Sequence, residues 1–269
     1  MTPSRVSLRR EGAVAVVTLS NAGRLNAMTR AMWRELRAAF AGLVGEEADG
    51  TDAGVRCVVV RGEGGAFCAG GDISEYPSFR FEEASLRAFH ENEVWAALQA
   101  LLDCPLPLVA QIEGACMGAG IEIASCCDIR LAGAGAKFGA PIAKLGFPMA
   151  PREAALVHGA IGDVLARDML LAAGVHGAQR LYDAGFLLRV LPDDEVAAAA
   201  QAHAARICAL APQAARLHKK TLAALRADAP PTAGARGVQG LLPTAYDYAD
   251  SAEHREGIAA FLAKRAPNF

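Results

Sequence analysis

The sequence offers little support for a metal site or a disulfide framework. Its seven cysteines follow no regular spacing and form no C-x-x-C motif, and its six histidines are dispersed along the chain. Zinc sites and disulfide-rich domains normally show regular cysteine or histidine spacing. We therefore expect no metal and no disulfide framework.

Long apolar runs and an excess of one charge are also absent. No uninterrupted apolar stretch reaches about 18 residues, so no membrane span is expected. The formal net charge is -2 and basic residues cluster at most as pairs, such as Lys219-Lys220. This gives no electrostatic case for nucleic acid. The first residues, Met-Thr-Pro-Ser-Arg, lack an apolar signal segment, which predicts a cytoplasmic protein.

The 269 residues, 53% of them hydrophobic, are sufficient for a large core. Strand-type and helix-type patterns alternate over about the first 190 residues, and helical patterns alone fill the rest. Such alternation predicts an α/β fold with mostly parallel strands. We expect an α/β core at residues 1–193 and a helical C-terminal region at residues 194–269.

Local signals place the individual elements. Thr29 is a suitable N-cap for an amphipathic helix ending near Val44. Residues 75–80, with Pro77 and aromatic side chains, are expected to form a surface loop. Strands are expected at 6–10, 13–19, 55–61, 107–112, 129–132, 136–139 and 186–191, and helices at 82–102, 150–160, 162–172 and 179–184.

Two turns rich in small residues follow two of these strands, at 62–72 and 114–120. Small residues let a ligand approach the backbone closely. The second turn leads into a short apolar helix, whose first N–H groups lack helical acceptors. Two such turns can direct two backbone N–H donors at one developing oxyanion.

Glu122 lies in the first turn of that apolar helix. A carboxylate there either stabilises the helix terminus or performs acid/base chemistry. The apolar neighbours Ile121 and Ile123 favour a raised pKa for Glu122. A dinucleotide site is not indicated, because no G-x-G-x-x-G motif opens a helix, and no P-loop is present.

Four segments together carry a family resemblance: Asn21–Met28, Gly64–Asp72, Gly114–Ile129 and Glu256–Phe269. In this order and spacing they resemble the enoyl-CoA hydratase/isomerase (crotonase) superfamily over nearly the whole chain. The resemblance implies a crotonase-like spiral of ββα units followed by a helical region. It also implies homotrimers or homohexamers that act on acyl-CoA thioesters, with coenzyme A entering as part of the substrate and no other cofactor.

The resemblance also assigns roles to residues in the two turns. The oxyanion donors would be the N–H groups of Ala69 and Ala119, and Glu122 would move the proton. The family usually has glycine at the position of Ala119. Alanine keeps the backbone N–H donor, and its methyl group would narrow the site. Coenzyme A contacts would come from Arg24, Ala69, Gly70, Gly71, Asp72, Ile73 and Lys264, while Phe261 would pack either on the coenzyme or in the core.

The sequence departs from the family's hydratases at one position. They use two glutamates, and the second falls on Ile142, which favours one-base isomerisation by Glu122. Two alternatives stay open: a hydratase with a substitute carboxylate such as Glu153, or a CoA-ester binding protein with little catalysis. Glu153 would otherwise pair with Arg152 or cap its helix.

The acyl-binding part of the site is expected from residues 74–81, 82–102 and 147–149. These stretches are mostly apolar or aromatic, which predicts an apolar acyl chain or ring. His90, flanked by Glu91 and Glu93, is expected on a solvated helix face.

Overall fold

The protein was analysed as a computed structural model. The structure describes residues 3–48 and 54–227, and in the C-terminal stretch residues 252, 253, 256, 260, 263–265, 267 and 268. Phe261 lies outside the described residues, so its expected role stays a prediction. The expected division of the chain at residue 193 also stays a prediction, although residue 193 itself is described.

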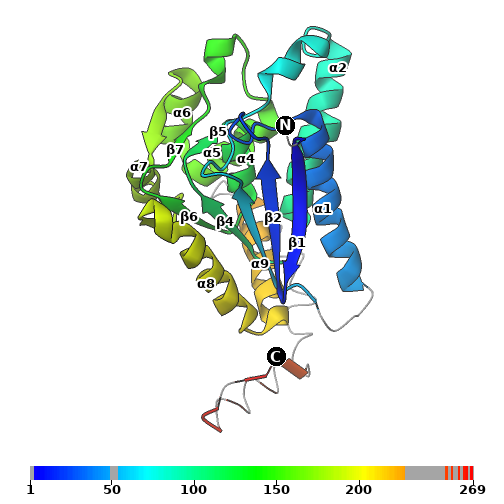
Figure 1. Ribbon diagram of the computed structural model, residues 1–269, viewed down its shortest axis with the longest axis vertical. Helices are drawn as coiled ribbons and strands as arrows, with labels where there is room; N and C mark the ends of the chain where they lie inside the picture. Colours follow the sequence, from blue (N-terminus) through cyan, green and yellow to red (C-terminus); the bar gives the residue numbers. More distant parts are fainter. Residues whose placement is uncertain are drawn as a thin grey trace.

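A six-stranded sheet forms the centre of the fold (Figure 1), in the order β1-β2-β3-β4-β6-β9. β1 and β2, both predicted as strands, form an antiparallel hairpin, and the other neighbours in this sheet are parallel. The prediction of an α/β fold with a mostly parallel sheet is confirmed. The strands are β1 (Arg5–Glu11), β2 (Val14–Ser20), β3 (Cys57–Gly62), β4 (Leu108–Ile112), β6 (Ile129–Gly133) and β9 (Arg189–Leu191).

Side chains of the central strands alternate between two apolar layers. Val14 and Val16 of β2 pack in a cluster with helix α8 (Val196–Cys208). Ala15 and Val17 pack in the larger cluster on the opposite face of the sheet. Because both faces are covered, these strands appear in the sequence as almost continuous apolar runs.

Two predicted long helices cover this second face. Helix α1 (Arg30–Ala48) begins after Thr29, whose Oγ1 accepts a hydrogen bond from Met32 N at 3.2 Å, which confirms the N-cap. The helix predicted at 82–102 consists of α2 (Glu83–Ala88), a π-helical segment η2 (Phe89–Val94) and α3 (Trp95–Asp103). π-helical segments often occur at functional sites.

A second sheet has the order β5-β7-β8. Its strands are β5 (Ala115–Met117), β7 (Lys137–Gly139) and β8 (Val175–Gly177). The sequence predicted β7 but missed β5, which lies inside a turn rich in small residues, and β8. β5 occupies the middle of the second turn and leads into helix α4 (Ala119–Cys126).

The other elements surround the two sheets. Lys219 of α9 connects this helix to the core, since its Nζ donates to Leu106 O at 2.7 Å and lies 2.8 Å from Asp128 Oδ2. In the described part of the chain no helix is long and apolar enough to cross a membrane. The elements are η1 (Ile73–Ser78), η3 (Pro141–Leu145), α5 (Pro151–Ile161), α6 (Asp163–Leu171), α7 (Ala178–Asp183), η4 (Asp193–Glu195) and α9 (Pro212–Ala227).

Gly120 allows α4 to lie directly against the first glycine-rich turn. A Cβ atom at this position would be 2.5 Å from Cys68 O and 3.1 Å from Cys68 Cβ. The first distance is shorter than side chains tolerate, and it is to a backbone oxygen that cannot move alone; the second is tight. The close approach therefore requires glycine at this point.

We predict that Gly120→Ala lowers the free energy of unfolding by about 1–3 kcal/mol through overpacking. The matched control is Gly159→Ala in α5, where an added Cβ meets nothing within 4 Å. Alanine there should stabilise the helix by up to about 1 kcal/mol. Urea unfolding of both variants tests the prediction, which is wrong if Gly120→Ala is as stable as wild type.

Candidate active site

The two glycine-rich turns are joined by backbone hydrogen bonds. Cys68 N donates to Ala115 O at 2.8 Å, and Met117 N donates to Cys68 O at 2.8 Å. These two bonds form a bridge between Cys68 and Cys116. The first turn and the segment that leads into α4 therefore form one continuous wall, as the sequence predicted.

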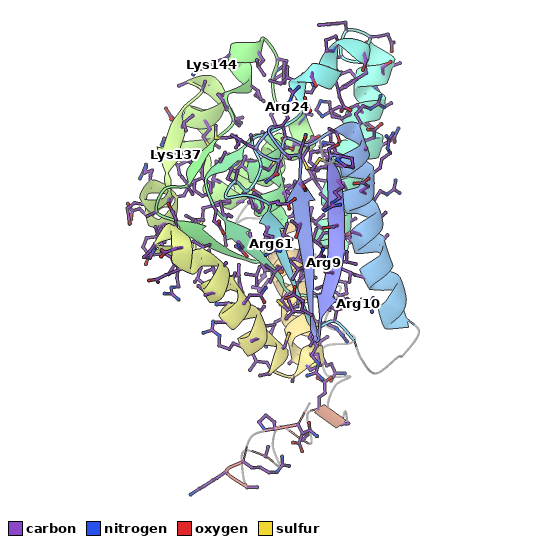
Figure 2. The ribbon with its side chains drawn as sticks, viewed as in Figure 1. Arg9, Arg10, Arg24, Arg61, Lys137 and Lys144 are labelled. Carbon is purple, nitrogen blue, oxygen red and sulfur yellow. The ribbon has the colours of Figure 1, made fainter. Side chains whose placement is uncertain are left out.

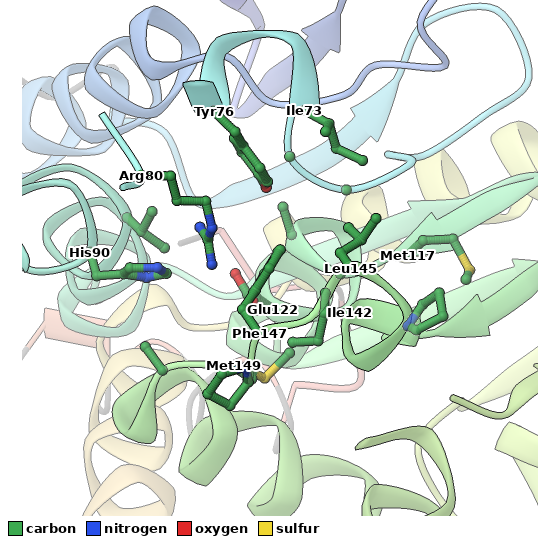
Figure 3. Close-up of a pocket in the computed structure, with 18 of the residues that line it drawn as sticks. Ile73, Tyr76, Arg80, His90, Met117, Glu122, Ile142, Leu145, Phe147 and Met149 are labelled. Carbon is green, nitrogen blue, oxygen red and sulfur yellow. The ribbon is translucent and has the colours of Figure 1, made fainter. Parts of the chain in front are cut away.

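A pocket of about 340 Å³ opens against this wall (Figure 3). Residues from both turns form one side of it, and the rest comes from α1, η1, η2, η3 and the segments that follow η1 and η3. Its lining consists of Trp33, Ala69, Gly70, Gly71, Ile73, Tyr76, Arg80, Phe89, His90, Val94, Met117, Gly118, Ala119, Glu122, Pro141, Ile142, Lys144, Leu145, Phe147, Pro148, Met149 and Ala150.

Glu122 is the one carboxylate among these lining residues. Its side chain belongs to the first turn of α4, and the residue is 9% exposed. Burial raises the pKa of Glu122 to about 8, and the nearby charge of Glu153 contributes in the same direction. The sequence prediction of a raised pKa is thus supported, and the carboxyl group holds its proton more tightly than an exposed glutamate would.

The predicted role of Ala69 as an oxyanion donor is wrong. Ala69 N donates to Leu25 O at 2.9 Å, so this N–H group is already used within the fold. Met28 lies beside Gly71 in a parallel bridge: Met28 N donates to Gly70 O, and Asp72 N donates to Met28 O, both at 2.8 Å. In such a ladder the N–H of Gly71 points away from Met28. Gly71, which lines the pocket, is therefore the better candidate donor.

Ala119 retains the geometry expected for the second donor. It is the first residue of α4, so its N–H has no acceptor within the helix. Gly118 precedes it with φ of +48°, a left-handed conformation that glycine adopts readily, and Gly118 N donates to Gly139 O at 2.9 Å. The turn therefore leaves the Ala119 N–H at the edge of the pocket.

His90 and Glu153 form a pair that the sequence did not predict. His90 lines the pocket from η2, and its Nδ1 lies 3.1 Å from Oε1 of Glu153, which is 2% exposed. The expectation of a solvated face for His90 is wrong, because the π-helical segment directs this position inward. Glu153 is buried too, but it is absent from the pocket lining. With Glu153 ionised, Nδ1 carries the proton and Nε2 is free to accept one.

Ile142 lines the pocket from η3, together with Met149 (Figure 3). The position at which the family's hydratases have a second glutamate therefore faces the pocket, and it is apolar. None of the described residues that line the pocket from η3 or from the segment after it is a carboxylate.

The residues predicted to bind coenzyme A are only partly brought together. Gly70, Gly71 and Ile73 line the pocket, and Arg24 Nη1 lies 3.6 Å from Asp72 Oδ1. Asp72 also accepts a hydrogen bond from Ser74 N at 3.0 Å, so it stabilises its own turn. 

Two lysines bear on the predicted coenzyme A contacts, one that the prediction missed and one that it named. Lys144 lines the pocket, and Figure 2 places it at the same end of the molecule as Arg24; it was missed because one lysine in a loop carries no pattern. Lys264 is exposed and is not part of the pocket lining.

Two further pocket residues, Tyr76 and Arg80, come from the stretch that was expected to be a surface loop. Its residues form η1 instead, and the side chain of Tyr76 lies over Gly71. The sequence predicts that this stretch contributes to the acyl pocket, but it does not show which of its side chains point into the pocket. Among the described residues no group of three or more His, Cys, Asp or Glu side chains could hold a metal ion.

Known proteins resemble this chain over nearly its whole length. Residues 9–269 match the enoyl-CoA hydratase/isomerase family. An Escherichia coli protein named 2,3-dehydroadipyl-CoA hydratase is 33% identical over 276 residues, which cover 99% of this chain and 98% of that one. The Mycobacterium bovis protein named "Probable enoyl-CoA hydratase echA8" is 30% identical over 270 residues, covering 100% and 99%.

Solved structures give the same result. A crystal structure described as an enoyl-CoA hydratase/carnithine racemase from Magnetospirillum magneticum superimposes with a TM-score of 0.88 at 36% identity, covering 98% of this chain and 94% of that one. The chain belongs to the enoyl-CoA hydratase/isomerase family and has the crotonase-type fold. Because this is a family of enzymes, the protein is an enzyme.

We predict a pH-dependent stability that originates in Glu122. Its carboxyl pKa is about 8 in the folded protein and near 4.5 when exposed, so folding favours the protonated form. This contribution is fully present below the lower value and is lost as pH rises toward about 8, by up to about 1.4 kcal/mol per pH unit.

The measurement is the free energy of unfolding of wild type minus that of Glu122→Gln between about pH 5 and pH 8. The difference should fall with increasing pH, because glutamine has no proton to lose. Glu11→Gln, at an exposed position in β1, is the control and should follow wild type. A difference that does not change with pH contradicts the raised pKa.

Proposed function

We propose that the protein isomerises the double bond of an enoyl-CoA thioester, with Glu122 as its single base. The observation that carries this proposal is that Glu122 is the one carboxylate lining the described pocket, while Ile142 lines the same pocket without a titratable group. A reaction that removes and returns one proton needs one such group. Binding of coenzyme A through Arg24, Lys144 and residues 70–73, and assembly into trimers or hexamers, belong to the same proposal.

The proposed reaction moves one proton and leaves the enzyme unchanged. Ionised Glu122 takes a proton from the α-carbon of a 3-enoyl thioester, and the electron pair of that C–H bond delocalises onto the thioester oxygen. The N–H groups of Gly71 and Ala119 stabilise this enolate oxygen. Glu122 then returns the proton to the γ-carbon, and the double bond lies between the α- and β-carbons.

The orientation of Gly71 and Ala119 supports this scheme. Gly71 belongs to the first turn and Ala119 to the second, and both line the pocket that contains Glu122. Preorganised donors of this kind need no rearrangement when charge develops on the oxygen, and losing one typically costs about 10²–10³ in rate.

We predict that Glu122→Gln lowers the turnover of a 3-enoyl-CoA by about 10² or more, because the proton acceptor is lost. Binding of the CoA ester should be largely unchanged. For wild type, kcat/KM should rise with pH up to about 8, since the ionised form of Glu122 is required.

The assay follows the absorbance gained when the thioester becomes conjugated, with Glu11→Gln as the control. Full activity of Glu122→Gln would contradict the proposal. If wild type binds CoA esters but converts neither 3-enoyl nor 2-enoyl esters, the binding-protein alternative is supported instead.

A second candidate function is hydration of a 2-enoyl-CoA. Adding water across the double bond needs one group to deprotonate water and another to protonate the α-carbon. The pair of His90 and Glu153, with its 3.1 Å contact, supplies a second titratable group in the pocket beside Glu122. In this scheme His90 is the group that meets water, and Glu153 orients its ring.

For this candidate we predict that wild type consumes crotonyl-CoA and that His90→Gln lowers hydration by about 10²–10⁴. Glu153→Gln should lower hydration less, because it acts by positioning His90. Both variants should retain isomerisation of a 3-enoyl-CoA, and this change in the ratio of the two activities would not arise from a general structural defect. The control is His158→Gln, an exposed histidine that lies 3.2 Å from Asp163. Unchanged hydration in His90→Gln would exclude the role of His90.

A further inference from the structure

Arg80 carries a positive charge into the pocket, and no described residue is its acidic partner. It follows η1, and Figure 3 shows its guanidinium directed into the pocket on the same side of Glu122 as His90. Within the ranges that the structure describes, no carboxylate lies within ion-pair distance of Arg80, and its guanidinium makes no hydrogen bond. A guanidinium has five N–H donors, so this group is available to a ligand.

Two aromatic rings hold the guanidinium in place. Its Cζ lies 3.5 Å from the ring centroid of Phe147 and 4.7 Å from that of Tyr76. The two rings contact each other edge-on, with centroids 6.0 Å apart. Stacking on a ring fixes the plane of an arginine and leaves its N–H edge free. Partial burial lowers the pKa of Arg80, and the neighbouring Tyr76 acts in the opposite direction.

Three acidic side chains on segments beside the pocket have other partners, and within the described residues Glu122, which lines the pocket, forms no ion pair with Arg80. Asp72 accepts from Ser74 and lies near Arg24, and Glu153 contacts His90. Glu75 Oε2 accepts a hydrogen bond from the backbone N of Arg30 at 2.7 Å. Arg80 is half-buried, so its charge is only partly solvated, and no carboxylate of the described residues neutralises it.

We infer that Arg80 binds a carboxylate at the far end of the acyl group, so that the substrate is the CoA monothioester of a dicarboxylic acid. The planar fork of a guanidinium matches a carboxylate with two parallel hydrogen bonds. The inference rests on the proposed function in placing an acyl-CoA in this pocket. It also revises the sequence prediction of a purely apolar acyl group, which considered the aromatic residues of 74–81 but not Arg80.

The test measures binding, which needs no turnover. The probes are CoA monothioesters of short saturated dicarboxylic acids and their methyl esters of equal chain length, titrated calorimetrically into wild type. Wild type should bind the free carboxylate about tenfold or more tightly than the methyl ester. Arg80→Met should abolish this preference while leaving the affinity for the methyl ester unchanged, and Arg80→Lys should retain part of it.

Arg152→Met is the matched control. Arg152 also lies over an aromatic ring, with Cζ 5.7 Å from the centroid of Trp95, but it is exposed and outside the pocket lining. This variant should retain the wild-type preference.

Two results would overturn the inference. Equal binding of both esters by wild type would remove the need for a carboxylate, and this comparison requires no variant. If Arg80→Met weakens both esters equally, Arg80 binds a coenzyme A phosphate that both probes share. A preserved preference without turnover of any enoyl-CoA would refute the proposed reaction alone, whereas turnover without the preference would refute the inference alone.

Discussion

The site depends on the close contact between two backbone segments that are far apart in the sequence. The hydrogen bonds that link Cys68 with Ala115 and Met117 hold the two turns together, and Gly120 lets α4 approach to the distance of backbone contact. Because these are backbone interactions on rigid strand ends, the N–H groups beside them are fixed before any ligand binds. A catalytic group that is fixed in advance loses little energy to reorganisation during the reaction.

The same packing explains the state of Glu122. Gly120 brings its helix so close to the first turn that the carboxyl group is removed from water, and burial then raises its pKa. A base with a pKa near the working pH can both accept and return a proton, which an exposed glutamate does poorly. The constraint that positions the oxyanion donors is therefore also the one that tunes the base.

The sequence predicted features governed by local patterns and missed those set by backbone direction or side-chain rotation. The buried strands, the Thr29 cap and Glu122 each have a local signal, and the structure has them at the expected positions. The sequence alone does not show that the N–H of Gly71, and not that of Ala69, is available, because its direction depends on pairing with Met28, a contact between distant residues. The charged neighbours of His90 predict an exposed helix face, and the sequence contains no signal for the π-helical segment that changes its orientation.

Arg80 shows a further limit of composition-based reasoning. One charge among aromatic residues changes the chemistry of a pocket more than its average polarity suggests, since a partly desolvated charge favours a ligand of opposite charge. With the inferred carboxylate on Arg80 and the thioester oxygen on the donors of Gly71 and Ala119, the acyl chain would be held at both ends. Two fixed ends restrict the carbons between them to positions near Glu122, which lowers the entropic cost of reaching the reactive geometry. Substrate selection and catalysis would then depend on the same pair of anchors.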